Sequence, residues 1–137
     1  MNTEKLITEL RQIIADNTGL ALNKVFTPDL PKEVVNGVAI TLLGGDTTNN
    51  ICNGIEYADI SGRVLVRGSE NDTETRKLCD EIFNALHLLY DYEFDYGKII
   101  NVVCQLPVFV GKDENNINVY NITFNLKLRG GNYGEFS

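Results

Sequence analysis

The sequence lacks the residue patterns on which most enzymes depend. It contains one histidine, His87, with no HExxH or comparable partner, and neither a GxxxxGK[ST] phosphate loop nor a GxGxxG motif. Catalysis usually needs a nucleophile, a base or a metal gathered in a pocket. We therefore predict that the chain is not an enzyme and has no catalytic residue, no cofactor and no metal site. His87 is interpreted as a residue on the flank of a helix.

Cysteine is scarce, and its spacing indicates no pairing. The three cysteines, Cys52, Cys79 and Cys104, are far apart and form no CxxC pair, which argues against a zinc site or a redox pair. Cys79 and Cys104 stand among apolar residues and are predicted to be small core side chains. Cys52 stands in a polar stretch and is expected to be exposed.

Long apolar runs and basic clusters are missing as well. No run approaches the length that crosses a bilayer, and the first residues lack the pattern of a signal peptide, so we expect a protein kept in the cytoplasm, with no membrane partner. The formal net charge is -7, and the 12 lysines and arginines are scattered. This charge disfavours binding to nucleic-acid phosphates. It would still allow DNA to pass through a ring of such subunits without being held.

What is present suits one globular domain. A chain of 137 residues with 43% hydrophobic residues can build one core. We place this domain at residues 1–129. The glycine-rich residues 130–137 are expected to form a flexible C-terminal tail.

Two amphipathic helices are predicted from apolar residues at helical spacing. The first runs from about Thr3 to Asn17. The second begins at an N-cap supplied by Asn71 or Asp72, and its predicted buried line consists of Leu78, Ile82, Leu86 and Leu89.

Four longer segments are predicted to be strands: Val34–Leu43, Ile55–Arg67, Ile99–Val110 and Ile117–Arg129. In the second of these, Ser61 and Gly62 suggest a bulge or a bend. In the last, Ile122, Phe124, Leu126 and Leu128 alternate with polar residues, as in a sheet with one wet face. Short connections favour antiparallel pairing. The predicted fold class is therefore α+β, an antiparallel sheet with two amphipathic helices packed on one face.

Two polar segments are interpreted as loops that reach a partner. Residues 44–53 are glycine-led and longer than a usual hairpin loop, and residues 111–118 form a charged hairpin tip. We expect both to be mobile in a free subunit and ordered at contacts, where Asp113 and Glu114 would meet lysine or arginine. The candidate assembly contacts are Asp46, Asn49, Asn50, Lys112, Asp113 and Glu114.

Residues 90–96 alternate aromatic and acidic side chains, which leaves two interpretations open. Asp91, Glu93 and Asp95 could bind a cation or act as acid and base, but the run lacks the mid-loop glycine and terminal glutamate of a calcium loop. The alternative, which we favour, is an edge or loop with the aromatic rings turned inward and the acids in water.

The order of elements resembles that of a known family. The most specific pieces are the strand end V-x-V-R-G at residues 64–68 and the hairpin P-x-x-x-G-K-D-E at residues 107–114. Together with the order helix, strands, helix, strands over nearly the whole chain, they resemble the minor capsid or tail terminator proteins of tailed bacteriophages and related tail-like particles. A head-closure or connector adaptor could show similar features, and a small ligand-binding domain using residues 90–96 is the rival from another class.

The resemblance implies a sheet flanked by helices and a homohexameric ring at the head-proximal end of a phage tail tube. Such a ring would stop tube growth and offer a docking face to the head. The implied partners are further copies of the chain, the tail tube protein and a head-completion or connector protein, with DNA passing through the lumen. The implied location is the virion, after assembly in the host cytoplasm.

Overall fold

The structure is a computed structural model that describes residues 3–50, 55–95 and 97–130. Cys52, residues 51–53 of the predicted loop and residues 131–137 of the predicted tail lie outside this part of the chain. The elements follow the order helix, strands, helix, strands: α1 (Thr3–Thr18), a 3-10 turn η1 (Leu22–Lys24), β1 (Val25–Phe26), β2 (Gly37–Asn50), β3 (Ile55–Arg67), α2 (Asp72–His87), β4 (Tyr90–Phe94), β5 (Gly97–Cys104), β6 (Val108–Lys112) and β7 (Asn118–Gly130).

Both helices lie where periodicity predicts them, and local chemistry explains their ends. The side-chain oxygen of Asn71 accepts a hydrogen bond from the Glu74 N–H at 3.2 Å, so Asn71 is the N-cap of α2. Asp72 and Glu74 in the first turn favour the positive end of the helix dipole. α1 ends at Thr18, and Gly19 follows with a φ of 73°, the left-handed conformation that stops a helix.

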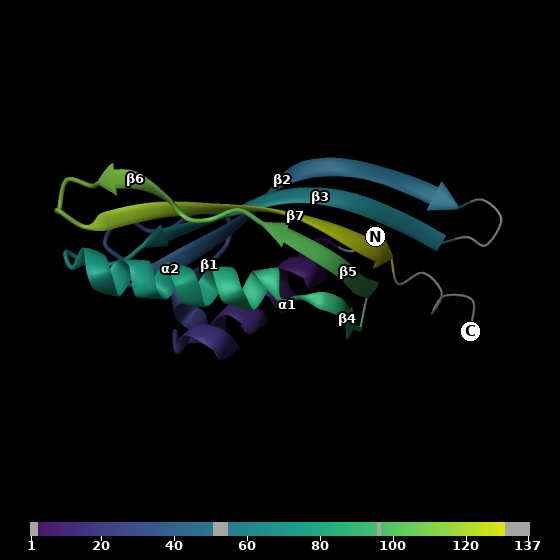
Figure 1. The fold of residues 1–137 in the computed structure, drawn as a ribbon, viewed down its shortest axis with the longest axis horizontal. Helices are drawn as coiled ribbons and strands as arrows, with labels where there is room; N and C mark the ends of the chain where they lie inside the picture. Colours follow the sequence, from purple (N-terminus) through teal and green to yellow (C-terminus); the bar gives the residue numbers. More distant parts are fainter. Residues whose placement is uncertain (1–2, 51–54, 96, 131–137) are drawn as a thin grey trace.

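The strands form a single seven-stranded sheet with the order β1-β2-β3-β7-β5-β4, and β6 also pairs with β7 (Figure 1). The α+β class is confirmed. The sheet is mixed rather than purely antiparallel, because β1 runs parallel to β2 through Val25↔Val38 and Phe26↔Ala39. The irregular segment between them contains Pro28 and Pro31, which cannot continue a ladder, and it returns the chain to the start of β1. Figure 1 shows α1 and α2 on the same side of the sheet.

The predicted loop at residues 44–53 is wrong for its described part. Residues up to Asn50 continue β2, and the ladder with β3 extends from Gly37↔Arg67 to Asn50↔Ile55. Beyond Gly44 the two strands form a long arm, which we call the β2–β3 arm (residues 44–50 and 55–61; Figure 1). The β2 half of the arm is polar and exposed at residues 44–47, so it shows no apolar alternation, whereas Ala58 and Ile60 of its β3 half are buried.

The bulge predicted at Ser61 and Gly62 lies instead on the opposite strand. The register shifts between Leu42 and Gly44, so Leu43 is the extra residue. Gly44 has a φ of 102°, which glycine adopts without a steric penalty. A Cβ on Gly62 would lie 2.4 Å from Cζ of Phe124, so Gly62 is required by a close approach rather than by a bend.

The predicted single strand Ile99–Val110 is also wrong, because it is two strands. β5 pairs with β7 as far as Cys104↔Phe124, and β6 pairs with the first part of β7 from Val108↔Asn121. Between them, Gln105 N–H still donates to the Thr123 carbonyl at 2.9 Å, but Pro107 has no N–H to donate. The ladder therefore stops and restarts.

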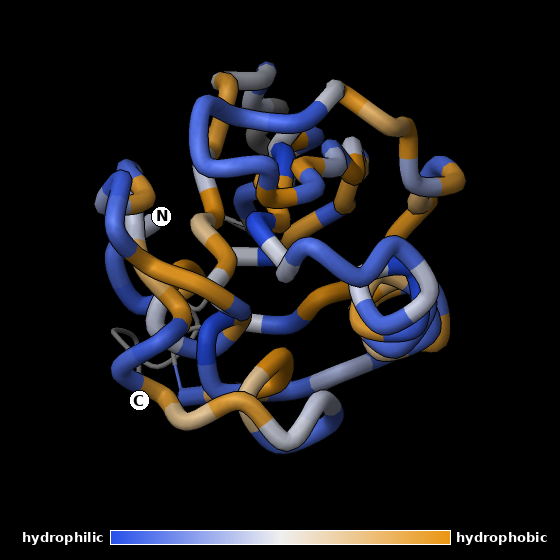
Figure 2. Tube along the Cα trace, turned by 90° about the vertical axis from the view of Figure 1, so that its left-hand side faces the viewer, coloured by the Kyte–Doolittle hydropathy of each residue, from blue (hydrophilic) through white to orange (hydrophobic). Residues whose placement is uncertain are grey.

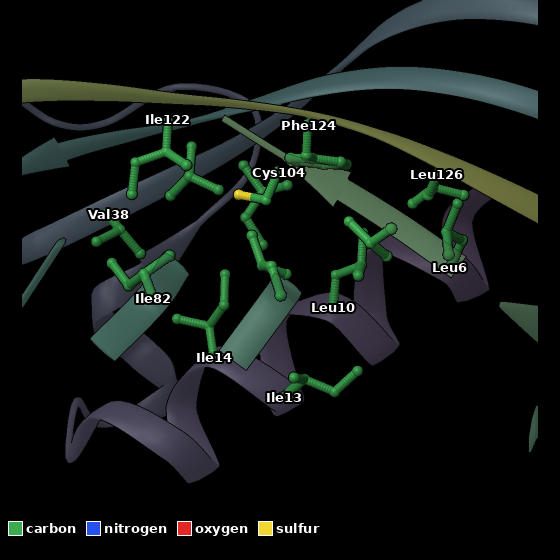
Figure 3. Packing of buried hydrophobic residues seen from close by; sticks show 14 of the residues in the cluster. Leu6, Leu10, Ile13, Ile14, Val38, Ile82, Cys104, Ile122, Phe124 and Leu126 are labelled. Atoms are coloured by element: carbon green, nitrogen blue, oxygen red, sulfur yellow. The ribbon is translucent and has the colours of Figure 1, made fainter. Parts of the chain in front are cut away.

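The core lies between the sheet and the two helices (Figure 3). Ile122, Phe124, Leu126 and Leu128 of β7 are almost completely buried, as predicted, together with Leu6, Leu10 and Ile14 of α1. In Figure 2, hydrophilic and hydrophobic residues alternate in short stretches along the chain, as expected for elements with one buried side.

The buried line of α2 differs from the prediction. It consists of Thr75, Cys79, Ile82 and Leu86, whereas Leu78 and Leu89 are only half-buried. The reason is Thr75, whose hydroxyl accepts from the Ser69 N–H at 3.1 Å and donates to the Asn71 carbonyl at 3.0 Å. These bonds turn Thr75 inward and so fix the rotation of the helix.

Cys79 and Cys104 are buried, as predicted. Burial raises the pKa of the Cys79 thiol to about 12, with smaller contributions from Asp80 and Asp72. Burial alone raises the pKa of Cys104 to about 11. Both thiols therefore remain protonated at neutral pH and act as small apolar side chains.

Candidate assembly surfaces

The predicted contact residues fall on two separate parts of the fold. Asp46, Asn49 and Asn50 lie on β2 in the arm, at register positions opposite Asp59, Glu56 and Ile55. Lys112 ends β6, and Asp113 and Glu114 begin the turn to β7. The structure therefore does not bring the two groups together in one chain, because β3 and β7 lie between β2 and β6.

Asp113 has a partner within its own chain. Oδ2 of Asp113 lies 2.6 Å from Nη2 and 2.7 Å from Nε of Arg67, whose side chain is 8% exposed. Oδ1 of Asp113 accepts from the backbone N–H groups of Asn115 at 2.9 Å and Ile117 at 3.0 Å. Burial alone would raise the pKa of Asp113, but the Ile117 and Asn115 N–H groups and the Arg67 guanidinium together lower it. The carboxylate therefore stays ionised and anchors the turn.

The same turn is held from its other end. Ile117 and Asn118 are buried, and the Asn118 amide donates to the carbonyls of Ser69 at 3.0 Å and Glu70 at 3.2 Å. The C-terminal end of this predicted loop is therefore packed on its own domain. Lys112 and Glu114 remain as the exposed charges of the turn.

We expect acid to weaken this hairpin. A carboxyl whose pKa is lowered by folding stabilises the protein above its unfolded pKa of about 3.9, and the stabilisation is lost as the pH falls through the folded pKa. The melting temperature of the wild type should therefore drop more steeply between pH 5 and about pH 2 than that of Asp113→Asn. The variant should already melt lower at pH 7, because Arg67 is left buried without its carboxylate. Parallel melting curves over this range would contradict the assignment.

β6 is an exposed apolar edge. Val108, Phe109 and Val110 are 61%, 50% and 61% exposed, and Leu106 just before them is 71% exposed. Phe109 tilts against the ring of Tyr120 at 5.3 Å between centroids. Soluble proteins usually protect a free strand edge with charge, proline or a cover, so an edge of this composition indicates an interface.

The sequence alone did not identify this surface, although it contains a signal. Residues 106–110 read Leu-Pro-Val-Phe-Val, an apolar run that does not alternate. A strand with two buried faces has the same composition, so the sequence predicts this run only as the end of the strand Ile99–Val110. Only the pairing with β7 shows that its other edge is open.

The acidic–aromatic segment forms another edge strand, β4, which lies beyond β5 on the same side of β7 as β6. Tyr92 and Phe94 are half-buried against the core, as the edge interpretation predicts, but Tyr90 points outward and is 79% exposed. Nζ of Lys98 lies 2.5 Å from Asp91 and 3.9 Å from Glu93. These two acids therefore have a cation within the chain.

Tyr92 ties β4 to the first helix. Its hydroxyl donates to Oε1 of Glu9 at 2.5 Å. This hydrogen bond, with burial and the charges of Glu9 and Asp16, raises the pKa of Tyr92 to about 12. Tyr92 thus acts as a protonated link between elements rather than as a base. Within residues 3–50, 55–95 and 97–130, no group of three or more His, Cys, Asp or Glu is arranged to hold a metal ion.

His87 is exposed at the end of α2 and stacks on Phe83, with 5.0 Å between ring centroids and 14° between ring planes. This position agrees with the interpretation as a helix-flank residue. Among the described residues, no helix has the length and apolar character needed to cross a membrane.

Comparison with known proteins identifies the architecture. A family model described as "Bacteriophage tail terminator protein" matches residues 11–129. A chain from the solved "Virion of native gene transfer agent (GTA) particle" has a similar fold, with a TM-score of 0.59 and 12% identity over 90% of this chain and 92% of that chain. The comparison with curated proteins found no match.

Proposed function

Because this chain belongs to the bacteriophage tail terminator family, we propose that it forms a ring at the head-proximal end of a phage tail tube. The chain is a structural protein of the virion tail. The proposed ring is a homohexamer that stops the addition of tube subunits and offers a docking face to a head-completion or connector protein. The family match over residues 11–129 carries this proposal.

The open strand edges of the fold support the formation of a ring. A cyclic ring needs a heterologous contact, in which one patch of a subunit meets a different patch of its neighbour. Besides the edge strand β4, the described part of the chain has an apolar open edge on β6 and a polar one on the β2–β3 arm. Of the candidate contacts that we keep, Asp46, Asn49 and Asn50 lie on the arm, Lys112 ends β6, and Glu114 lies in the turn that follows it.

The charge of the chain suits a ring through which DNA passes. With a net charge of -7, a lumen built from such subunits would repel phosphates rather than bind them. We therefore propose that DNA crosses the ring without specific binding, and that the partners of the ring are proteins. No enzymatic step is part of this role.

The rival use of residues 90–96 as a ligand site is weaker. Lys98 lies against Asp91 and Glu93, and the hydroxyl of Tyr92 is bound to Glu9. A ligand would have to displace these contacts. The same groups are explained by the protection of an edge strand with charge.

A polymerisation assay tests the proposed function. Tail tube protein would be assembled alone and with increasing amounts of this protein, and tube lengths would be measured by electron microscopy. A terminator should shorten the tubes in proportion to its amount and should bind at one end. Tubes of unchanged length, or protein bound along the tube wall, would contradict termination. A head-closure adaptor would leave tube length unchanged and bind only completed tails.

A further inference from the structure

β6 combines an open edge with exposed apolar side chains. It pairs with β7 on one side, from Val108↔Asn121 to Lys112↔Asn118, and no strand of the described chain lies on its other side. A bulge next to Gly111 twists the strand, but Val108 and Val110 both remain 61% exposed. This edge therefore has free backbone groups and apolar surface at the same place, as sites of strand addition do.

β2 offers the complementary edge. β1 covers β2 only at Val38 and Ala39, and from Ile40 to Asn50 no strand in the described part of the chain pairs with its outer side. The edges of β2 and β6 cannot meet within one chain, because β3 and β7 separate them. A β2 edge that reaches β6 must therefore come from a second copy.

Charge favours β2 over β4 as the incoming strand. Asp46 of β2 lies directly opposite Asp59, and like charges in such a pair destabilise each other. On its other side, Asp59 lies opposite Lys127 of β7. Asp46 is on the outermost strand, and the residue opposite it is Asp59 rather than a lysine or arginine. The acids of β4 already have Lys98.

Lys112 supplies the missing cation. It is exposed at the end of β6 and forms no ion pair within the described residues. Two copies that each carry a net charge of -7 repel each other, so a local pair of opposite charges is needed where they meet. Asp46 and Lys112 are such a pair, and they lie on the two open edges.

We propose that β6 of one copy receives the β2–β3 arm of a second copy as an added strand, with the Asp46 carboxylate of the incoming arm beside Lys112. This contact deepens the proposed ring function and rests on it. Each copy would use β6 on one side and β2 on the other, so the contact repeats around a ring and leaves neither of these two edges free after closure.

Replacement of Val108 tests the apolar part of the contact. Val108→Lys places a charge on the edge, where natural sheets use lysine to prevent pairing. The matched control is Leu88→Lys, which charges an exposed apolar residue, 76% exposed, at the end of α2. Sedimentation velocity should show the wild type and Leu88→Lys as rings and Val108→Lys as a monomer with an unchanged circular dichroism spectrum. Rings of Val108→Lys at wild-type concentrations would overturn the proposal.

Charge reversal tests the pairing itself. Asp46→Lys and Lys112→Glu should each shift the mass from ring to monomer, and the double variant should recover the ring, because the pair is restored with opposite signs. A double variant no better than either single variant would overturn the Asp46–Lys112 contact. A wild-type protein that stays monomeric, alone and with tail tubes, would instead contradict the proposed ring function.

Discussion

Replacing Phe124 with alanine should lower the free energy of unfolding by roughly 3–5 kcal/mol. Phe124 is 1% exposed on β7, and its ring lies over Gly62 of β3, where a Cβ would come within 2.4 Å of Cζ. The neighbouring strand therefore presents only backbone under the ring. It has no side chain that could move into the space that alanine leaves.

Urea denaturation followed by circular dichroism would measure this loss. The matched control is Val103→Ala on β5, where the side chain is 60% exposed and the expected change is within about 0.5 kcal/mol. Equal midpoints for the two variants would mean that Phe124 is not at the centre of the core.

Gly45→Ala should abolish ring assembly while leaving most of the domain stable. A Cβ on Gly45 would lie 1.9 Å from the carbonyl oxygen of Asp59 and 2.9 Å from Cα of Ile60. These are backbone atoms of the paired strand, so the ladder must open at this point. The arm beyond it would then no longer present Asp46 in its position at the edge.

Two measurements on one sample check this result. The melting temperature of Gly45→Ala should fall by less than that of Phe124→Ala, because Gly45 is exposed on the outer strand of the arm, whereas Phe124 is 1% exposed within the core. Sedimentation should show monomers. Thr47→Ala, an exposed position on the same strand, is the control and should assemble normally. Normal rings from Gly45→Ala would show that the arm does not contribute to the contact.

Periodicity predicted the elements that have one buried side. β7 is predicted from the alternation of Ile122, Phe124, Leu126 and Leu128 with polar residues, and the structure buries these four side chains. The predicted bounds of β3 and the starts of both helices agree with the structure to within about one residue. Local sequence contains this information, because burial on one side repeats with the period of the element.

Elements outside the core were not predictable in this way. The outer part of β2 reads Gly-Gly-Asp-Thr-Thr and is a strand only because β3 pairs with it over its whole length. The parallel pairing of β1 with β2 and the split between β5 and β6 likewise depend on partners distant in sequence. Pairing over long distances leaves no local periodicity.

The assembly surface was predicted in part. The charged residues of the arm and of the hairpin turn were identified from the sequence. The sequence does not identify the apolar edge of β6, which precedes this turn, nor the ion pair of Asp113 with Arg67, 46 positions away. A carboxylate in a polar turn looks the same in sequence whether it faces solvent or a buried arginine.

Electron microscopy of completed tails that carry a tagged form of this protein tests the central claim most directly. The proposed terminator should appear as one closed ring of six subunits, at the head-proximal end of each tube and nowhere else. Label along the tube, label at the distal tip, or a single unclosed subunit at the head-proximal end would contradict the account.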